Sequence, residues 1–230
     1  VGTGANKMAW SGDKQRLFVG VDYGVQTIEV PAMARSLAFA LDPLGNGVTP
    51  IDLASPPGSS NLLAVAGIQP WSGFVGLYKN GVLCSNTVAR RESRLQFSTP
   101  DRIHVLVPGG SLQVSTLGVG PDGLVELTNN SGFASWGAGA DFRFDQGRLY
   151  TAPGAVLDAG TLAVLGTFPS ISTGALVYPE NSAGRVFFLL CESNVWALAA
   201  FDAQSYQRLG SLPIPGVSRS EEHTSELQSR

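Results

Sequence analysis

The stretch NKMAWSGDKQRLFVGV, residues 6–21, joins a short apolar-alternating segment through a tight turn to a second segment that contains Arg-Leu-Phe-Val. Alternation of this kind predicts two β-strands that form a hairpin. The pattern occurs five times, and its second strands are expected to begin at Gln15, Asn61, Arg102, Gly147 and Gly184. The steps between these positions are roughly 40 residues, the length of one repeating supersecondary unit.

Each repeat has room for four short strands separated by turn residues. In the first repeat the strands are expected at 6–11, 15–21, 27–32 and 36–42. In the second, Asn80-Gly81 predicts a two-residue hairpin turn before a single strand at 81–88, because both residues tolerate positive φ. No stretch keeps a helical period over more than two turns. A period near 40 residues with four strands per copy is typical of β-propeller blades.

The predicted fold is therefore an all-β β-propeller with about five four-stranded antiparallel blades, part of a larger, seven-bladed ring. The blades are expected at residues 1–45, 46–90, 91–132, 133–169 and 170–216. Residues 217–230 are set aside as a non-native tail, because residues 219–229 read RSEEHTSELQS and resemble the translation of a sequencing-library adapter. The chain also starts inside a repeat, at Val1, so the sequence is expected to be a fragment.

The composition favours a globular β-protein. Charged residues make up 14% of the chain, and 28 glycines and 14 prolines supply turns. The net charge of −3 provides no electrostatic footprint for a polyanion, so nucleic acid is not expected as a partner. The longest apolar stretch, residues 186–201, is interrupted by Glu192, Ser193 and Asn194 and is interpreted as a hairpin, so no transmembrane segment is expected.

The first repeat resembles the YVTN-type repeat of bacterial β-propellers. The residues that follow its pattern are Val1-Gly2, residues 6–9, Ser11, Asp13 and residues 17–21. The sequence departs from the pattern at Gly12-Asp13, where the usual Asp-Gly order is reversed, and at Ala5, where proline is usual. The resemblance extends over residues 1 to about 216 with weaker later copies. It implies a periplasmic or extracellular bacterial propeller and assigns no activity.

The sequence matches that could indicate a nucleotide-binding or catalytic site are better explained by structural roles. Residues 118–123 fit G-x-G-x-x-G, but a nucleotide loop must open a helix, and Pro121-Asp122-Gly123 instead predicts a hairpin. His104 alternates with apolar residues in a strand, where a single histidine is more often packed than catalytic. The carboxylate pairs Asp13 with Asp22 and Asp141 with Asp145 are better explained as turn formers. No catalytic residue, cofactor site or metal site is predicted.

Four arginines precede the bulky pair of the second strand in four repeats: Arg16, Arg102, Arg148 and Arg185. They could form a ring for an anionic ligand at the channel or between blades. A repeated structural contact or a solvated turn charge is the favoured interpretation, because repeats duplicate structural residues first.

Three tryptophans, Trp10, Trp71 and Trp136, lie beside expected turns. If they gather on one face, they would form a platform for a carbohydrate or peptide, since exposed tryptophan is favoured at recognition sites. Packing within the core or between blades is the favoured alternative.

The function predicted from these observations is a non-enzymatic recognition or scaffold module, with a protein or a glycan as the unidentified partner at the bacterial surface. The competing hypothesis is a propeller enzyme of the quinone-dependent dehydrogenase, lyase or lactonase type, with its site at the channel mouth in a missing part. Such an enzyme would need polar side chains that converge on the axis. A third hypothesis is that an unclosed ring exposes sheet edges and apolar faces and has no function alone.

Overall fold

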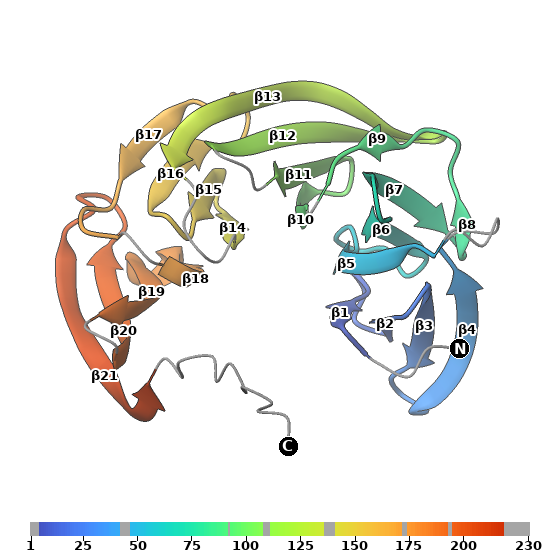
Figure 1. The fold of residues 1–230 in the computed structure, drawn as a ribbon, viewed down its shortest axis with the longest axis horizontal. Helices are drawn as coiled ribbons and strands as arrows, with labels where there is room; N and C mark the ends of the chain where they lie inside the picture. The colour runs from blue at the N-terminus through green and yellow to red at the C-terminus, as the bar shows by residue number, and fades with distance from the viewer. Residues whose placement is uncertain are drawn as a thin grey trace, which may run out of the picture.

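The computed structural model describes residues 5–41, 47–91, 93–107, 111–135, 141–171, 174–192 and 195–218. Over these residues the chain forms five antiparallel sheets that stand side by side in an open arc around a central axis (Figure 1). The first sheet is at one end of the arc and the fifth at the other. The all-β propeller fold with five blades is thereby confirmed, and a ring of seven stays a prediction.

Each sheet is a meander whose first strand lies nearest the axis (Figure 1). The first sheet contains β1 (Lys7–Trp10), β2 (Arg16–Val21), β3 (Gly24–Glu29) and β4 (Ala34–Ala40). The second contains β5 (Thr49–Ala54), β6 (Leu62–Ile68), β7 (Gly73–Lys79), β8 (Val82–Leu83) and β9 (Val88–Ala89). The third contains β10 (Arg94–Thr99), β11 (Arg102–Val107), β12 (Ser111–Gly120) and β13 (Gly123–Ser135).

The last two sheets follow the same plan. The fourth contains β14 (Phe142–Asp145), β15 (Arg148–Thr151), β16 (Ala155–Asp158) and β17 (Val164–Thr167). The fifth contains β18 (Gly174–Glu180), β19 (Arg185–Glu192), β20 (Val195–Asp202) and β21 (Arg208–Ser218). The helix in the described part of the chain is a single 3₁₀ turn, η1 (Asn181–Ala183), and no helix there is long and apolar enough to cross a membrane.

Two-residue turns with positive φ close several of the hairpins. Asn80 and Gly81 have φ angles of 51° and 78° between β7 and β8, which confirms the turn predicted from their sequence. Pro121 and Asp122 join β12 to β13 in a hairpin that opens no helix, so the G-x-G-x-x-G match is a turn, as predicted. Local turn chemistry therefore sets the strand order inside each sheet.

In the first sheet the predicted positions of two strands are wrong. The third strand was expected at 27–32 and the fourth at 36–42, but β3 and β4 begin three and two residues earlier, at Gly24 and Ala34. The cause is a two-residue turn at Asp22-Tyr23, in which Tyr23 has a φ of 65°. A tyrosine at positive φ is uncommon, so such a tight turn could hardly be predicted from these residues.

The second sheet also departs from the expected pattern at its outer edge. One strand was expected at 81–88, but the edge is divided into β8 and β9. Between them, Asn86 leaves the sheet, donates its backbone N–H to the Asp122 carbonyl at 2.7 Å and accepts from the Leu124 N–H at 3.1 Å. The edge is broken because its backbone bonds to the third sheet instead of its own.

Apolar side chains fill the interfaces between neighbouring sheets. Between the first and second sheets the buried residues include Phe18, Val25, Leu63, Val65 and Tyr78. Between the fourth and fifth they include Tyr150, Phe168, Phe188 and Phe201, whose rings pack largely edge to face. Each such side chain contributes about 1.5–3 kcal/mol when fully buried, so the interfaces hold the arc together.

Candidate functional site

The predicted arginines begin the second strand of four different sheets and are spread around the arc. Arg16 pairs through Nε with Glu29 at 2.8 Å and donates from Nη1 to the Ser60 carbonyl of the second sheet at 3.1 Å. Arg148 similarly donates from Nη1 to the Ala203 carbonyl of the fifth sheet at 3.2 Å. Arg102 and Arg185 are exposed at the starts of β11 and β19. Arg16 and Arg148 thus make a repeated contact with the next sheet.

The predicted tryptophan platform is not assembled by Trp10 and Trp71. Trp10 ends β1 and is 47% exposed, whereas Trp71 lies in the loop between β6 and β7 and is 93% exposed. In these antiparallel meanders the turn after the first strand and the turn after the second strand are at opposite ends of the sheet. The two indoles therefore face opposite sides of the propeller. Trp136 lies outside the described residues.

His104 is a fully buried residue of β11 with a hydrogen bond on each ring nitrogen. Nδ1 lies 3.0 Å from Thr116 Oγ1, and Nε2 lies 2.9 Å from Ser98 Oγ. The ring also stacks against Phe144 of the fourth sheet, at a centroid distance of 6.1 Å. Burial lowers the pKa of His104 to about 4, so the imidazole is neutral at pH 7. This geometry is that of a packed residue.

Carboxylates of the innermost strands join neighbouring sheets through backbone amides. Asp52 in β5 accepts the Leu95 N–H of β10 through Oδ2 at 2.8 Å. Asp141 accepts the Val177 N–H of β18 at 3.2 Å, and Asp145 accepts the Asn181 N–H at 3.3 Å. Asp141 and Asp145 thus bond between sheets, and Asp145 also flanks the two-residue turn at Gln146-Gly147. The other predicted pair, Asp13 and Asp22, lies in turns at opposite ends of the first sheet.

These carboxylates belong to a group of charges near the axis that the sequence interpretation missed. Burial raises the pKa of Asp52, and the positive charges of Arg94 and Lys7 oppose that rise. Burial likewise raises the pKa of Asp141, opposed first by Arg143, whose Nη1 lies 3.3 Å from it. The available signal was a charged residue inside the apolar first strand of successive repeats. Among the described residues, no group of three or more His, Cys, Asp or Glu side chains is placed to bind a metal.

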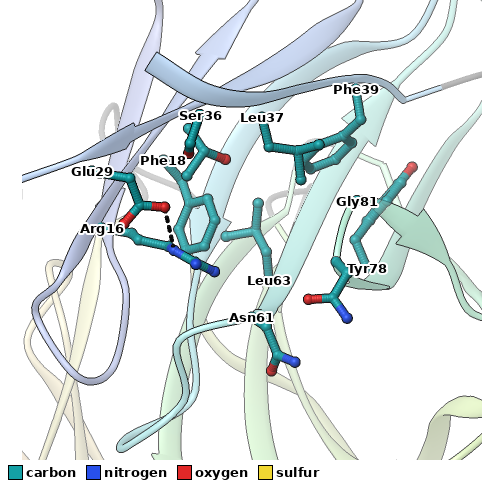
Figure 2. A pocket seen from close by; sticks show the side chains of 12 residues that line it. Arg16, Phe18, Glu29, Ser36, Leu37, Phe39, Asn61, Leu63, Tyr78 and Gly81 are labelled. Atoms are coloured by element: carbon teal, nitrogen blue, oxygen red, sulfur yellow. Dashed lines mark hydrogen bonds and ion pairs between the residues drawn. The ribbon is translucent and has the colours of Figure 1, made fainter. Parts of the chain in front are cut away.

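A cavity of about 270 Å³ lies between the first and second sheets (Figure 2). We call it the wedge. Its apolar walls are formed by Phe18, Leu37, Phe39, Leu63 and Tyr78. Its polar groups belong to Arg16, Glu29, Ser36, Asn61 and Asn80, with Arg16 and Glu29 joined by their ion pair. Figure 2 shows Ser36, Leu37 and Phe39 on one strand facing Asn61 and Leu63 across the space.

Thr27 also lines the wedge, and it is the most informative residue there. Thr27 is only 2% exposed, and its Oγ1 has no hydrogen-bond partner among the described residues. A buried hydroxyl without a partner carries a desolvation penalty of about 1–3 kcal/mol. Sequence reasoning missed Thr27 because whether its hydroxyl has a partner depends on side chains from other strands.

Comparisons with known proteins show the fold. No protein-family model matches the sequence, and no curated protein matches it. The Dos1 propeller aligns with a TM-score of 0.67 at 13% identity, over 91% of this chain and 61% of that one. AztD of Citrobacter koseri aligns with a TM-score of 0.65 at 8% identity, over 97% of this chain and 61% of that one.

A third similar structure is the dihydro-heme d1 dehydrogenase NirN in complex with DHE, with a TM-score of 0.64 at 15% identity. That alignment covers 94% of this chain and 49% of the NirN chain. The present chain thus spans less than two thirds of each of these three proteins. At such identities the similarity establishes a β-propeller and no activity. The finer YVTN resemblance stays a prediction.

Proposed function

We propose that the chain is part of a non-enzymatic recognition module that binds a protein or a glycan. The observation that carries this proposal is the wedge, a cavity with apolar walls, a polar rim and a buried hydroxyl that no described residue satisfies. Concave sites with mostly apolar walls and a few fixed polar groups are typical of ligand pockets.

The surroundings of the other candidate groups support the same proposal. His104, Asp52 and Asp141 each bond to neighbouring side chains or backbone amides, and Arg148 bonds to a carbonyl of the next sheet. The fold therefore uses at least part of their hydrogen-bonding capacity. In the wedge, by contrast, the Thr27 hydroxyl has no partner among the described residues, although neighbouring atoms cover it in the free protein.

The location and ring size belong to the proposal as well. The resemblance of the first repeat to YVTN-type propellers supports a periplasmic or extracellular place in a bacterium. Exposed apolar side chains on the outward faces of the first and fifth sheets support further blades, seven in the complete ring.

The test is binding of the labelled chain to an array that carries both neutral and acidic oligosaccharides and a set of peptides. Saturable binding to one class, competed by the same compound free in solution, would support the proposal. Absence of saturable binding to both classes would overturn it. The Trp71→Ala variant belongs beside the wild type, because its indole is the most exposed aromatic group among the described residues.

An enzyme at the channel mouth is the second candidate, and one observation favours it. Asp52 combines a raised pKa with the nearby charges of Lys7 and Arg94. NirN, a dehydrogenase by name, has a similar fold. The discriminating assay is turnover of dehydrogenase, lyase and lactonase substrates by the wild type and by Asp52→Asn. Turnover that this substitution abolishes would favour the enzyme over the recognition module.

A further inference from the structure

We infer that the wedge binds the terminal pyranose ring of a neutral glycan. This inference rests on the proposed recognition function and names its ligand. The steps are the size of the space, the charge of its rim, the kind of hydrogen bonds it offers and the nature of its walls.

The size of the wedge suits one small ring. A volume of about 270 Å³ lies just below the usual range for small-molecule pockets, roughly 300–1,000 Å³. It has room for a monosaccharide unit and not for a folded peptide segment. The rest of a glycan chain would extend past the exposed Ser36 on β4 at the mouth (Figure 2).

The rim has no net charge. Arg16 and Glu29 neutralise each other through the 2.8 Å contact between Nε and Oε1. The remaining polar residues of the rim, Ser36, Asn61 and Asn80, are neutral. An anionic ligand would therefore have to compete with Glu29 for the guanidinium. The rim favours a ligand without charge.

The polar groups both donate and accept hydrogen bonds. Asparagine amides offer two donors and an acceptor oxygen, and hydroxyls do both. Among the described residues the Thr27 hydroxyl has neither donor nor acceptor partner, and Arg16 uses Nε and Nη1 but not Nη2. Sugar hydroxyls match such a set, because each of them also donates and accepts.

The walls fit the other side of a sugar. A pyranose carries C–H groups on one face, and aromatic rings pack well against such apolar faces. Phe39 supplies the accessible ring beside the exposed Leu37, and the buried rings of Phe18 and Tyr78 form the floor, with the Tyr78 centroid 5.4 Å from that of Phe39. The Tyr78 hydroxyl is bonded to the Leu41 carbonyl at 2.8 Å and the side chain is only 1% exposed, so this residue supports the Phe39 ring from below and offers neither its ring face nor its hydroxyl.

The corresponding space between the fourth and fifth sheets provides an internal contrast. It measures about 180 Å³ and is lined by Gln146, Arg148, Asn181, Gly184, Ala203 and Gln204. No aromatic side chain is among these residues, and Arg148 occupies it with its bond to Ala203. The same position in the repeat is thus a polar contact between the fourth and fifth sheets and an aromatic-walled cavity between the first and second.

The experiment is saturation-transfer NMR on the full chain with five probes. Three are neutral: methyl β-D-glucopyranoside, methyl β-D-galactopyranoside and methyl α-D-mannopyranoside. N-acetylneuraminic acid tests an anionic sugar, and p-cresol tests a purely apolar ring. We expect saturable binding of at least one neutral pyranoside and weaker binding of the other two probes. No neutral binding, or preference for the acid or for p-cresol, would overturn the inference.

Thr27→Val is the decisive variant because it removes one hydroxyl and keeps the shape. We expect an affinity loss of about five- to tenfold for the bound pyranoside with an unchanged or higher Tm, since the hydroxyl has no partner in the free protein. Thr151→Val is the matched control: its buried Oγ1 donates to the Ala155 carbonyl and accepts the Ala155 N–H. That variant should lower the Tm and leave the affinity unchanged.

A second pair of variants tests the location independently of Thr27. Ser36→Trp should fill the mouth and abolish pyranoside binding, whereas Ala34→Trp, on the same exposed strand outside the wedge, should not. If the chain binds the array but no neutral pyranoside binds, and Thr27→Val leaves the array binding unchanged, the recognition function stands and the wedge inference falls. If the array shows no ligand at all, the proposed function itself falls.

Discussion

His104 shows how a titratable residue can serve a propeller without taking part in chemistry. Ser98 Oγ donates to the Arg102 carbonyl at 3.5 Å, so it accepts from His104 Nε2, and Nδ1 accepts from Thr116. This arrangement places the single proton of the neutral ring on Nε2, and burial of the ring opposes the addition of a second proton. Its neutral imidazole is a requirement of the fold.

This requirement makes stability depend on pH. An unfolded histidine takes up a proton near pH 6.5, whereas His104 in the fold does so near pH 4, because burial lowers its pKa. Stability is therefore lost as pH falls from 6.5 to 4, by about 3 kcal/mol. Urea unfolding of wild type and His104→Gln at pH 7 and pH 4 should show the wild type losing this amount relative to the variant. A difference that stays constant with pH would contradict the prediction.

Asp52 gives folding stability a pH dependence of the opposite sign to that of His104. Burial raises its pKa, so the folded protein takes up a proton before the unfolded chain does as pH falls towards 3.8. Wild type should therefore gain stability relative to Asp52→Asn over that window, as measured by urea unfolding. At pH 7 Asp52→Asn should stay folded because its amide oxygen still accepts the Leu95 N–H. Asp52→Leu removes that acceptor and should cost about 1–3 kcal/mol.

The contacts of individual residues were harder to predict than their positions in the repeat. The sequence placed Arg16 and Arg148 at equivalent points of the repeat, but the carbonyls they contact belong to turns 44 and 55 residues further along the chain. Thr27 carried no signal at all, because an unpartnered hydroxyl depends on side chains from β4, β6 and β7 that sequence alternation does not place. Residue types were visible in the sequence, and their partners were not.

At the scale of elements, the hairpin between β12 and β13 depends on Gly123. Its φ is 124°, and a Cβ there would overlap the Asn86 carbonyl that joins the second sheet to the third. Gly123→Ala should therefore destabilise the protein by about 2 kcal/mol or more, through backbone strain and a lost contact between sheets. Gly120→Ala is the control, because its Cβ would meet only the Gly123 oxygen, at 3.8 Å. Equal thermal unfolding of the two variants would contradict this role.

Strands could be predicted wherever alternation and a strong turn signal coincided. Asn80-Gly81 and Pro121-Asp122-Gly123 gave the hairpins that the structure contains. The failures occurred where the decisive residue was uncharacteristic, as with Tyr23 at positive φ, or where an edge bonds to another sheet, as at Asn86. Long-range backbone bonds leave no periodicity in the sequence, so such breaks were not foreseeable.

At the scale of the whole molecule, both ends of the arc present apolar faces. On the fifth sheet Leu176, Leu198 and Leu212 are exposed and stand in register across the strands, beside Tyr178 at 60% exposure. On the first sheet Met8 is 68% exposed. Contiguous apolar surface of this kind drives association. We expect the chain to self-associate as its concentration rises, measured by sedimentation velocity.

Charged substitutions on the terminal faces test whether these faces mediate the self-association. The double variant Tyr178→Glu/Leu198→Glu should shift the sedimentation profile towards monomer. Val125→Glu, which changes an equally exposed apolar residue on β13 of the middle sheet, should leave the profile as in wild type. A monomeric wild type at every concentration, or equal effects of both changes, would show that the terminal faces are not the contact.

The open arc also makes the sheets unequal in how easily they detach. The second, third and fourth sheets each pack against two neighbours, whereas the first and fifth pack against one (Figure 1). In a linear stack stability is close to a sum of nearest-neighbour interfaces, so fraying starts at the ends. The wedge lies between the first sheet and the second, so a sugar bound there would stabilise the interface that holds the first sheet to the rest of the arc. Binding of the sugar would then slow proteolysis of the N-terminal blade, so recognition and local stability would change together.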